Sequence, residues 1–151
     1  MPLSPSALWG EVVAAVAVDA ESRGVSVALE VEDDAGDLWA DPEQAMRVFK
    51  NLTLAGVRLT ARDACLRVRV RGTPEQQLIE LESVISGGSA DARPRLYRAA
   101  RSIPSAESFA VNAVRSFLRG CGGSVEALYM QDLGIVCTAH IPRQVSTRNA
   151  G

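Results

Sequence analysis

The chain has 151 residues, of which 47% are hydrophobic and 23% charged, and its formal net charge is -2. These values are typical of one globular domain with its own hydrophobic core. A net charge this small gives no reason to expect a nucleic-acid or membrane-surface partner. No apolar run approaches the roughly 18 residues that span a bilayer, so we expect a soluble, cytoplasmic protein with no membrane contact.

The cysteines and the single histidine argue against a metal site. Cys65, Cys121 and Cys137 are odd in number and lack the CxxC spacing of zinc ligands, so we expect three reduced, mostly buried thiols. His140 lies in an apolar run and is interpreted as a strand residue. We therefore expect no bound metal.

Two helix-start signals divide the N-terminal half of the chain. Ser4 and Pro5 have the order of an N-cap residue followed by proline at the first helical position, and they predict a helix over 6–23. Asp41 followed by proline is the second signal, and it predicts a helix over 42–61 with its apolar residues at helical spacing.

Alternation of apolar and polar residues predicts the strands. The strands are expected at 25–31, 37–40, 65–71, 77–82, 124–130 and 133–141. Short turns join 65–71 to 77–82 and 124–130 to 133–141, so each pair is expected to form a hairpin. Three arginines alternate along 65–71, and we interpret them as a solvated sheet face and not as a nucleic-acid contact.

The C-terminal half adds a loop and further helices. Residues 83–92 are polar and predict a loop, and a short helix is expected at 95–101. A firmer helix is expected at 105–119, with its inner side formed by Phe109, Ala113, Val114 and Phe117. Residues 143–151 are expected to form a flexible polar tail.

The order of these elements indicates the fold class. Hairpins separated by helices predict an α+β protein, a two-layer α/β sandwich with a mixed, mainly antiparallel sheet and helices on one face. We expect residues 1–142 to form this single domain.

Three fragments resemble the GHKL ATPase family, which has the Bergerat fold and includes histidine kinases, gyrase-type topoisomerases, MutL and heat-shock chaperones. They are Leu38-Trp39-Ala40-Asp41-Pro42 with Val48-Phe49-Lys50-Asn51-Leu52, then Ala113-Val114-Arg115 with Gly122-Gly123-Ser124-Val125, and finally the closing strand Gly134 to Pro142. Their order is most similar to the ATP-binding domain of histidine kinases, over about 6–142.

The resemblance implies an ATP site, but this sequence departs from the family pattern at each of its elements. Asn51 matches the first asparagine of the N box, whereas the second, a magnesium ligand in the family, is Ala55. A methyl group cannot coordinate a metal ion. Glu82 is expected where the family has its adenine-binding aspartate. The glycines that should follow it are replaced, and Gly87 and Gly88 lie further along as loop glycines or as a shifted phosphate loop.

The second glycine box of the family is also absent. Its glycines are replaced at Ala106, Ser108 and Ala110, and Glu107 places a negative charge where phosphates would bind. ATP and magnesium binding are therefore expected to be lost, and no cofactor or catalytic residue is expected. The phosphoacceptor helix pair with its histidine is missing too.

We interpret the chain as a non-catalytic, histidine-kinase-like (pseudo-ATPase) domain that binds a protein partner in bacterial two-component signalling. One alternative is an ATP-binding kinase domain with relocated loops that phosphorylates a histidine supplied elsewhere. Another is an unrelated α+β sandwich. In the active family a lid covers ATP. Here residues 83–105 could pack down into the vacated space, or the groove could stay open and receive a partner's side chains; we expect the first, with Leu96 or Tyr97 filling the space.

Overall fold

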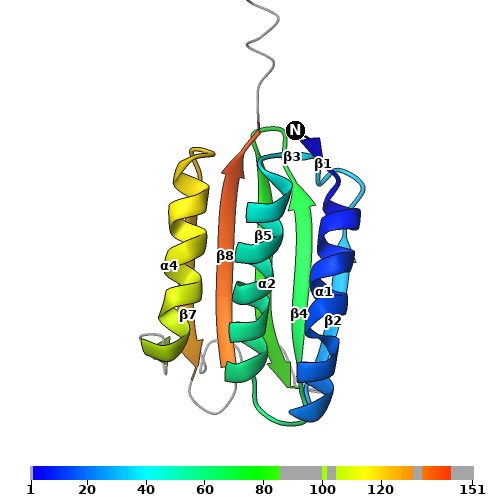
Figure 1. Cartoon of the computed structure of the whole chain (residues 1–151), viewed down its shortest axis with the longest axis vertical. Coiled ribbons are helices and arrows are strands. Elements are labelled where there is room, and N and C mark those ends of the chain that lie inside the picture. Colours follow the sequence, from blue (N-terminus) through cyan, green and yellow to red (C-terminus); the bar gives the residue numbers. More distant parts are fainter. Residues whose placement is uncertain (1, 86–99, 102–104, 131–133, 144–151) are drawn as a thin grey trace, which may run out of the picture.

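In the described part of the chain, three helices cover one face of a six-stranded sheet. The computed structural model describes residues 2–85, 100–101, 105–130 and 134–143. Helices α1 (Pro5–Ser22), α2 (Pro42–Leu59) and α4 (Ser105–Arg119) run side by side over the sheet, with α2 in the middle (Figure 1). The expected two-layer arrangement with helices on one face is confirmed.

The sheet is mixed and mainly antiparallel, as the sequence predicts. Its six strands lie in the order β2 (Ser26–Val31), β4 (Ala64–Gly72), β5 (Gln76–Ile85), β8 (Gly134–Pro142), β7 (Ser124–Met130) and β6 (Ala100–Arg101). Only β2 and β4 pair in parallel, and the other neighbours are antiparallel. Helix α2 lies over the middle of the sheet, where it contacts β5 and β8 (Figure 1).

Two short strands depart from expectation. Ala100–Arg101, the end of the segment expected to be a short helix, is strand β6 and extends the sheet beside β7. The rest of that segment lies outside the described residues. At the N-terminus, β1 (Pro2–Leu3) pairs with β3 (Leu38–Trp39), a contact too short and too distant in sequence to leave a periodic signal.

The two start signals act as predicted. The carboxylate of Asp41 accepts hydrogen bonds from the backbone N–H groups of Glu43 (2.9 Å) and Gln44 (3.4 Å), and the Ser4 hydroxyl accepts one from Ala7 N–H (3.5 Å). Both caps satisfy donors that have no partner within their own helix, and proline follows each of them. The sequence therefore fixes where α1 and α2 begin.

Aromatic side chains pack the three helices against one another and against the sheet. Phe49 of α2 is fully buried between Trp9 of α1 and Phe117 of α4, with ring centroids 5.1 and 5.7 Å apart. Beneath it lie apolar residues from the helix-facing side of the central strands, which are Leu66, Val68, Val70, Ile79, Leu81, Ile135, Cys137 and Ala139. Phe49 therefore joins all three helices over the core.

The Gly-Gly turn between α4 and β7 requires both glycines, for different reasons. Gly122 has φ = +74°, a conformation that glycine adopts without a Cβ penalty. A Cβ on Gly123 would lie 2.4 Å from the carbonyl oxygen of His140 on β8. The pair thus ends the helix and lets β7 start directly against its neighbour.

The outer face of the sheet carries a ladder of ion pairs. Arg67 contacts Glu82 at 3.2 Å, and Arg71 contacts Glu80 at 2.6 Å. The third arginine, Arg69, lies 3.2 Å from Glu30 and 3.3 Å from Glu32. Their charge is thus balanced by acidic residues of neighbouring strands, in agreement with the interpretation that this is not a nucleic-acid surface.

Arg143, expected to begin the flexible tail, is instead held by the fold. Its guanidinium donates hydrogen bonds to the backbone carbonyl oxygens of Thr73 (2.6 Å) and Asp34. Its backbone N–H donates a hydrogen bond to the backbone carbonyl oxygen of Glu75 (2.9 Å). Two turns at one end of the sheet offer these carbonyl groups, so Arg143 belongs to the folded domain and not to a tail. Residues 144–151 lie outside the described part of the chain.

Candidate functional site

An open groove runs between α2 and α4 on the outer side of the helix layer. It has a volume of about 360 Å³. Its lining consists of Asn51, Leu54, Ala55 and Arg58 from α2 and Glu107, Phe109, Ala110 and Ala113 from α4. The α2 residues follow helical spacing i, i+3, i+4 and i+7, so they form one stripe that faces α4. This groove is the largest concave surface that brings predicted site residues together.

Three of the five predicted site residues meet in this groove, and they are Asn51, Ala55 and Ala110. Ala55 is 3% exposed and forms part of the floor, whereas Asn51 is exposed at the rim. Ser108 lies on α4 between two lining residues, is half-buried, and does not line the groove. The expected cluster is thus real in part, and its chemistry is mostly that of methyl groups.

Glu82 does not reach the groove, and its expected position beside the cleft requires correction. Successive strand residues point to opposite faces of a sheet. Leu81 faces the helices and the core, so Glu82 faces outward, where it is paired with Arg67. The helix-facing residue at this end of β5 is Ser83. The parity of the buried positions 79, 81 and 83 is the sequence signal that could have identified it.

Ser83 joins β5 to the residue that follows α2 and to β8. Its hydroxyl lies 2.7 Å from that of Thr60 and accepts a hydrogen bond from the Ile135 N–H at 2.9 Å. Thr60 donates to the carbonyl oxygen of Gly56 at 2.7 Å, so Ser83 is the donor to Thr60. Both hydroxyl groups are buried, and each donates one and accepts one hydrogen bond within the chain. Neither hydroxyl proton at this junction is therefore free for a ligand.

Phe109 and Ala113 correct another expectation. Both were expected on the inner side of α4, yet Phe109 is 78% exposed and Ala113 is also exposed. The buried positions of the helix are Val111, Val114, Phe117 and Leu118. A helix turns by about 100° per residue, so Phe109 lies about 200° from Val111 and points outward. A large aromatic ring is thus presented beside the groove.

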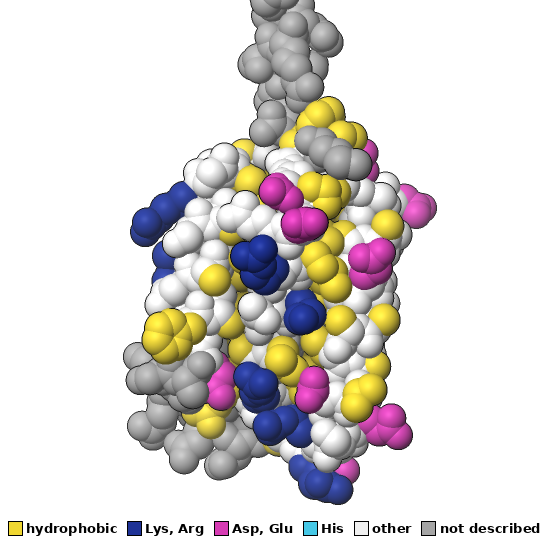
Figure 2. Space-filling model, in the orientation of Figure 1, with side chains coloured by type: hydrophobic (Ala, Val, Ile, Leu, Met, Phe, Trp, Pro, Cys, Tyr) yellow, Lys and Arg dark blue, Asp and Glu magenta, His cyan; other side chains and the backbone are white. Residues whose placement is uncertain are grey.

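Charge is unevenly distributed around the groove. Arg47, Lys50 and Arg58 lie on the outward side of α2, and basic side chains run down the middle of the helix layer in Figure 2. In the described part of the chain, no carboxylate lies within 4.0 Å of these three cations. Glu107, in the first turn of α4, is the one acidic residue of the lining. It occupies the end of the helix dipole that would otherwise attract an anion.

The cysteines and His140 supply no reactive centre near the groove. Burial raises the pKa of Cys137 to about 12, so its thiol stays protonated at neutral pH, and burial also raises the pKa of Cys121. Cys65 and Cys121 are half-buried free thiols. Among the described residues, no cluster of three or more His, Cys, Asp or Glu side chains could hold a metal ion, and no described helix could cross a membrane.

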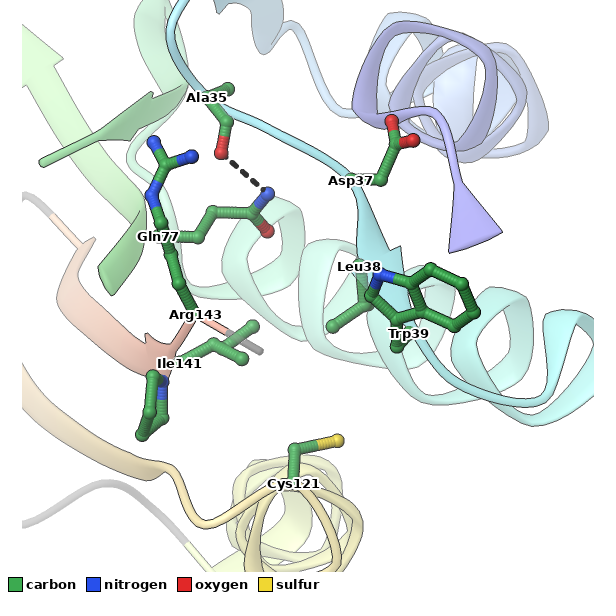
Figure 3. Close-up of a pocket in the computed structure, with 9 residues that line it drawn as sticks. Ala35, Asp37, Leu38, Trp39, Gln77, Cys121, Ile141 and Arg143 are labelled. Atoms are coloured by element: carbon green, nitrogen blue, oxygen red, sulfur yellow. Dashed lines mark hydrogen bonds between the residues drawn. The ribbon is translucent and has the colours of Figure 1, made fainter. Parts of the chain in front are cut away.

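A second hollow, at the end of the sheet, is too small for a ligand. Figure 3 shows it between the turn that holds Ala35, strand β3 and the end of β8. Gln77 projects into it and donates from its side-chain amide to the carbonyl oxygens of Ala35 (3.0 Å) and Gly36 (2.7 Å). Its volume is about 20 Å³, close to the minimum that holds one water molecule. We interpret it as a structural junction.

Solved structures with this fold are histidine kinase catalytic domains. The catalytic domain of histidine kinase ThkA superposes with a TM-score of 0.70 over 94% of this chain and 94% of that one, at 12% identity. The mycobacterial sensor histidine kinase MprB gives a TM-score of 0.69 over 94% and 96%, at 15% identity. No family model and no curated sequence matches the chain.

A longer ThkA chain, solved in complex with the response regulator protein TrrA, gives a TM-score of 0.66. This chain covers 42% of it and is 12% identical to it. These likenesses extend over nearly all of the chain, so it has the histidine-kinase type of ATPase fold. At such identities they establish the fold alone, and the loss of ATP and magnesium binding stays a prediction.

The expected packing of Leu96 or Tyr97 and the interpretation of Gly87 and Gly88 lie outside the described residues.

Proposed function

We propose that this chain is a non-catalytic, histidine-kinase-like domain that acts as a protein-interaction module in bacterial two-component signalling. The observation that carries the proposal is the lining of the groove between α2 and α4. Methyl groups of Ala55, Ala110 and Ala113 occupy it, together with the exposed ring of Phe109. A magnesium nucleotide needs oxygen ligands for the metal and close backbone N–H groups for the phosphates.

Polar groups at the end of α2 and the start of α4 support the same proposal. The hydroxyl protons of Ser83 and Thr60 are both donated within the chain, so neither is free to bind adenine. Glu107 opposes phosphate at the start of α4. Fold likeness to the ThkA chain that was solved with a response regulator supports a protein partner from a signalling pathway. The interaction itself is our inference.

Calorimetry with Mg-ATP tests the proposal directly. We expect no saturable heat up to about 1 mM nucleotide, which corresponds to a binding free energy weaker than about 4 kcal/mol. The measurement should be paired with Ala55→Asn, which restores an amide oxygen on the same helix face as Asn51. This variant should stay inert too, because the groove retains Ala110 and Glu107.

A phosphotransfer assay separates the proposal from the alternative of an active kinase. The chain is incubated with γ-labelled ATP, magnesium and a separately supplied histidine-bearing phosphoacceptor domain. We expect no transfer of label above the level without the chain. A micromolar dissociation constant in calorimetry would overturn the proposed loss of nucleotide binding, and transfer that depends on the chain would establish the kinase with relocated loops.

A further inference from the structure

We propose that the groove between α2 and α4 is the docking site for an acidic amphipathic helix of a partner protein. This inference rests on the proposed function, since it assigns a binding surface to the proposed protein-interaction module. It names the chemistry of the partner, namely two or three apolar side chains on one helix face, flanked by carboxylates.

The length of the groove fits one face of a short helix. Its α2 wall extends from Asn51 to Arg58, which is about 10 Å at roughly 1.5 Å per residue. Apolar anchors at positions i, i+4 and i+7 of a partner helix span the same distance. Leu54 and Ala55 in the floor and Ala110 opposite them leave room for such side chains. The volume of about 360 Å³ is open along its length.

The exposed ring of Phe109 supports a protein occupant. A fully exposed phenylalanine brings no stability to its own domain, whereas aromatic residues beside a pocket dominate many protein interfaces. At 78% exposed, Phe109 leaves most of its apolar surface in water at the edge of the groove. A helix laid between α2 and α4 would cover this ring.

Charge decides which kind of helix fits. Arg47, Lys50 and Arg58 are placed before and beside the groove along the outward side of α2. None of them has an ion-pair partner among the described residues. Carboxylates on the partner, at both ends of its apolar anchors, would meet these cations and steer association. On the α4 side, Glu107 excludes acidic residues, so the partner should be neutral or basic there.

The same features disfavour a nucleic acid in this groove. Phosphate binding relies on converging cations and free N–H groups at a helix N-terminus. Here Glu107 stands in the first turn of α4, and methyl groups and Phe109 form most of the lining. Apolar side chains with cations at the ends of the groove, Arg58 among its lining, are the pattern of a helix-binding groove.

Selection from a displayed library of random 16-residue peptides, with the whole chain as bait, tests the proposal. Enriched peptides should carry apolar residues at i, i+4 and i+7 with Asp or Glu on either side. The strongest peptide is then synthesised and titrated by fluorescence anisotropy. We expect Phe109→Ala and Arg58→Glu each to weaken its binding at least about tenfold. Val18→Ala, at an equally exposed apolar residue on α1 (78%), is the matched control and should leave affinity unchanged.

A charge-swap rescue adds a test that a general loss of structure could not imitate. Replacing only the carboxylates at the Arg58 end of the peptide by lysine should abolish binding to the wild type and restore it to Arg58→Glu. Enrichment of neutral or basic peptides, enrichment of none, or equal affinity for all the variants overturns the proposal. So does a concentration-dependent dimer that Phe109→Ala dissociates, because a second copy would then occupy the groove.

Mg-ATP in the same titration keeps the two proposals apart. If nucleotide displaces the peptide at micromolar concentration, the proposed loss of nucleotide binding is wrong while helix docking stands. If nucleotide has no effect and no acidic peptide binds, only the docking proposal fails.

Discussion

The two faces of this molecule use their basic residues differently. On the outer face of the sheet, Arg67, Arg69 and Arg71 all lie within 3.3 Å of a glutamate on a neighbouring strand or turn. On the outer face of the helix layer, Arg47 and Arg58 have no such partner in the described part of the chain. The first set forms ion pairs within the fold, whereas the second forms none within the described part of the chain.

Aromatic residues of the helix layer repeat the contrast. Phe49 is fully buried and joins the three helices, whereas Phe109 is 78% exposed beside the groove. The difference suggests that the fold is stabilised by one set of side chains and that binding depends on another. Substituting the same residue type at one site from each set tests this separation, because each pair shares its chemistry and differs in its surroundings.

The largest contrast is expected between the two phenylalanines. Phe49→Ala should lower the free energy of unfolding by about 3–5 kcal/mol, since it removes a fully buried ring and leaves a cavity between Trp9 and Phe117. Phe109→Ala should change it by less than about 0.5 kcal/mol. Urea unfolding followed by circular dichroism measures both. A large destabilisation by Phe109→Ala would show that this ring serves the fold and would weaken its role in docking.

A smaller contrast is expected between two serines. Ser83→Ala should cost about 1–3 kcal/mol, because the buried N–H of Ile135 and the hydroxyl of Thr60 would each lose a partner. Ser116→Ala, on the exposed side of α4, should change stability by less than about 0.5 kcal/mol. The same unfolding experiment compares them. Equal effects would mean that the hydrogen bonds of Ser83 with Thr60 and Ile135 contribute nothing to stability.

The sequence predicted the elements well because their signals are local. Caps at Ser4 and Asp41 and the alternation in the strands depend only on near neighbours, and the structure confirms them. Pairing of β1 with β3 and the position of β6 depend on contacts between distant segments. Such contacts leave no periodic pattern in the sequence, so the short helix expected at 95–101 was wrong at its last two residues.

The candidate site was harder to predict than the fold. Its α2 positions Asn51 and Ala55 were found because they belong to one helix motif with fixed spacing. Glu82 was misplaced because a shift of one residue along a strand moves a side chain to the opposite face. Phe109 was assigned to the core because it is apolar, yet the phase of α4 is set by Val111 and Val114. Hydrophobicity alone does not fix that phase.

The smallest contrast, and the most direct test of the comparison between the two faces, is expected between two arginines. Arg67→Ala should lower the free energy of unfolding by about 1–2 kcal/mol, between the values typical of exposed and buried ion pairs. The reason is that Glu82, whose side chain is only 11% exposed, would lose this guanidinium. Arg47→Ala should change stability by less than about 0.5 kcal/mol, because no described carboxylate pairs with it.

Titration of the acidic peptide should give the opposite ranking of the two arginine variants. Because Arg47 stands on the α2 stripe that leads into the groove, Arg47→Ala should weaken the acidic peptide severalfold, whereas Arg67→Ala should leave its affinity unchanged. If Arg47→Ala instead destabilised the fold as much as Arg67→Ala, its guanidinium would have a partner within the chain. The helix face would then no longer differ from the sheet face, and the charge argument for an acidic partner would lose its basis.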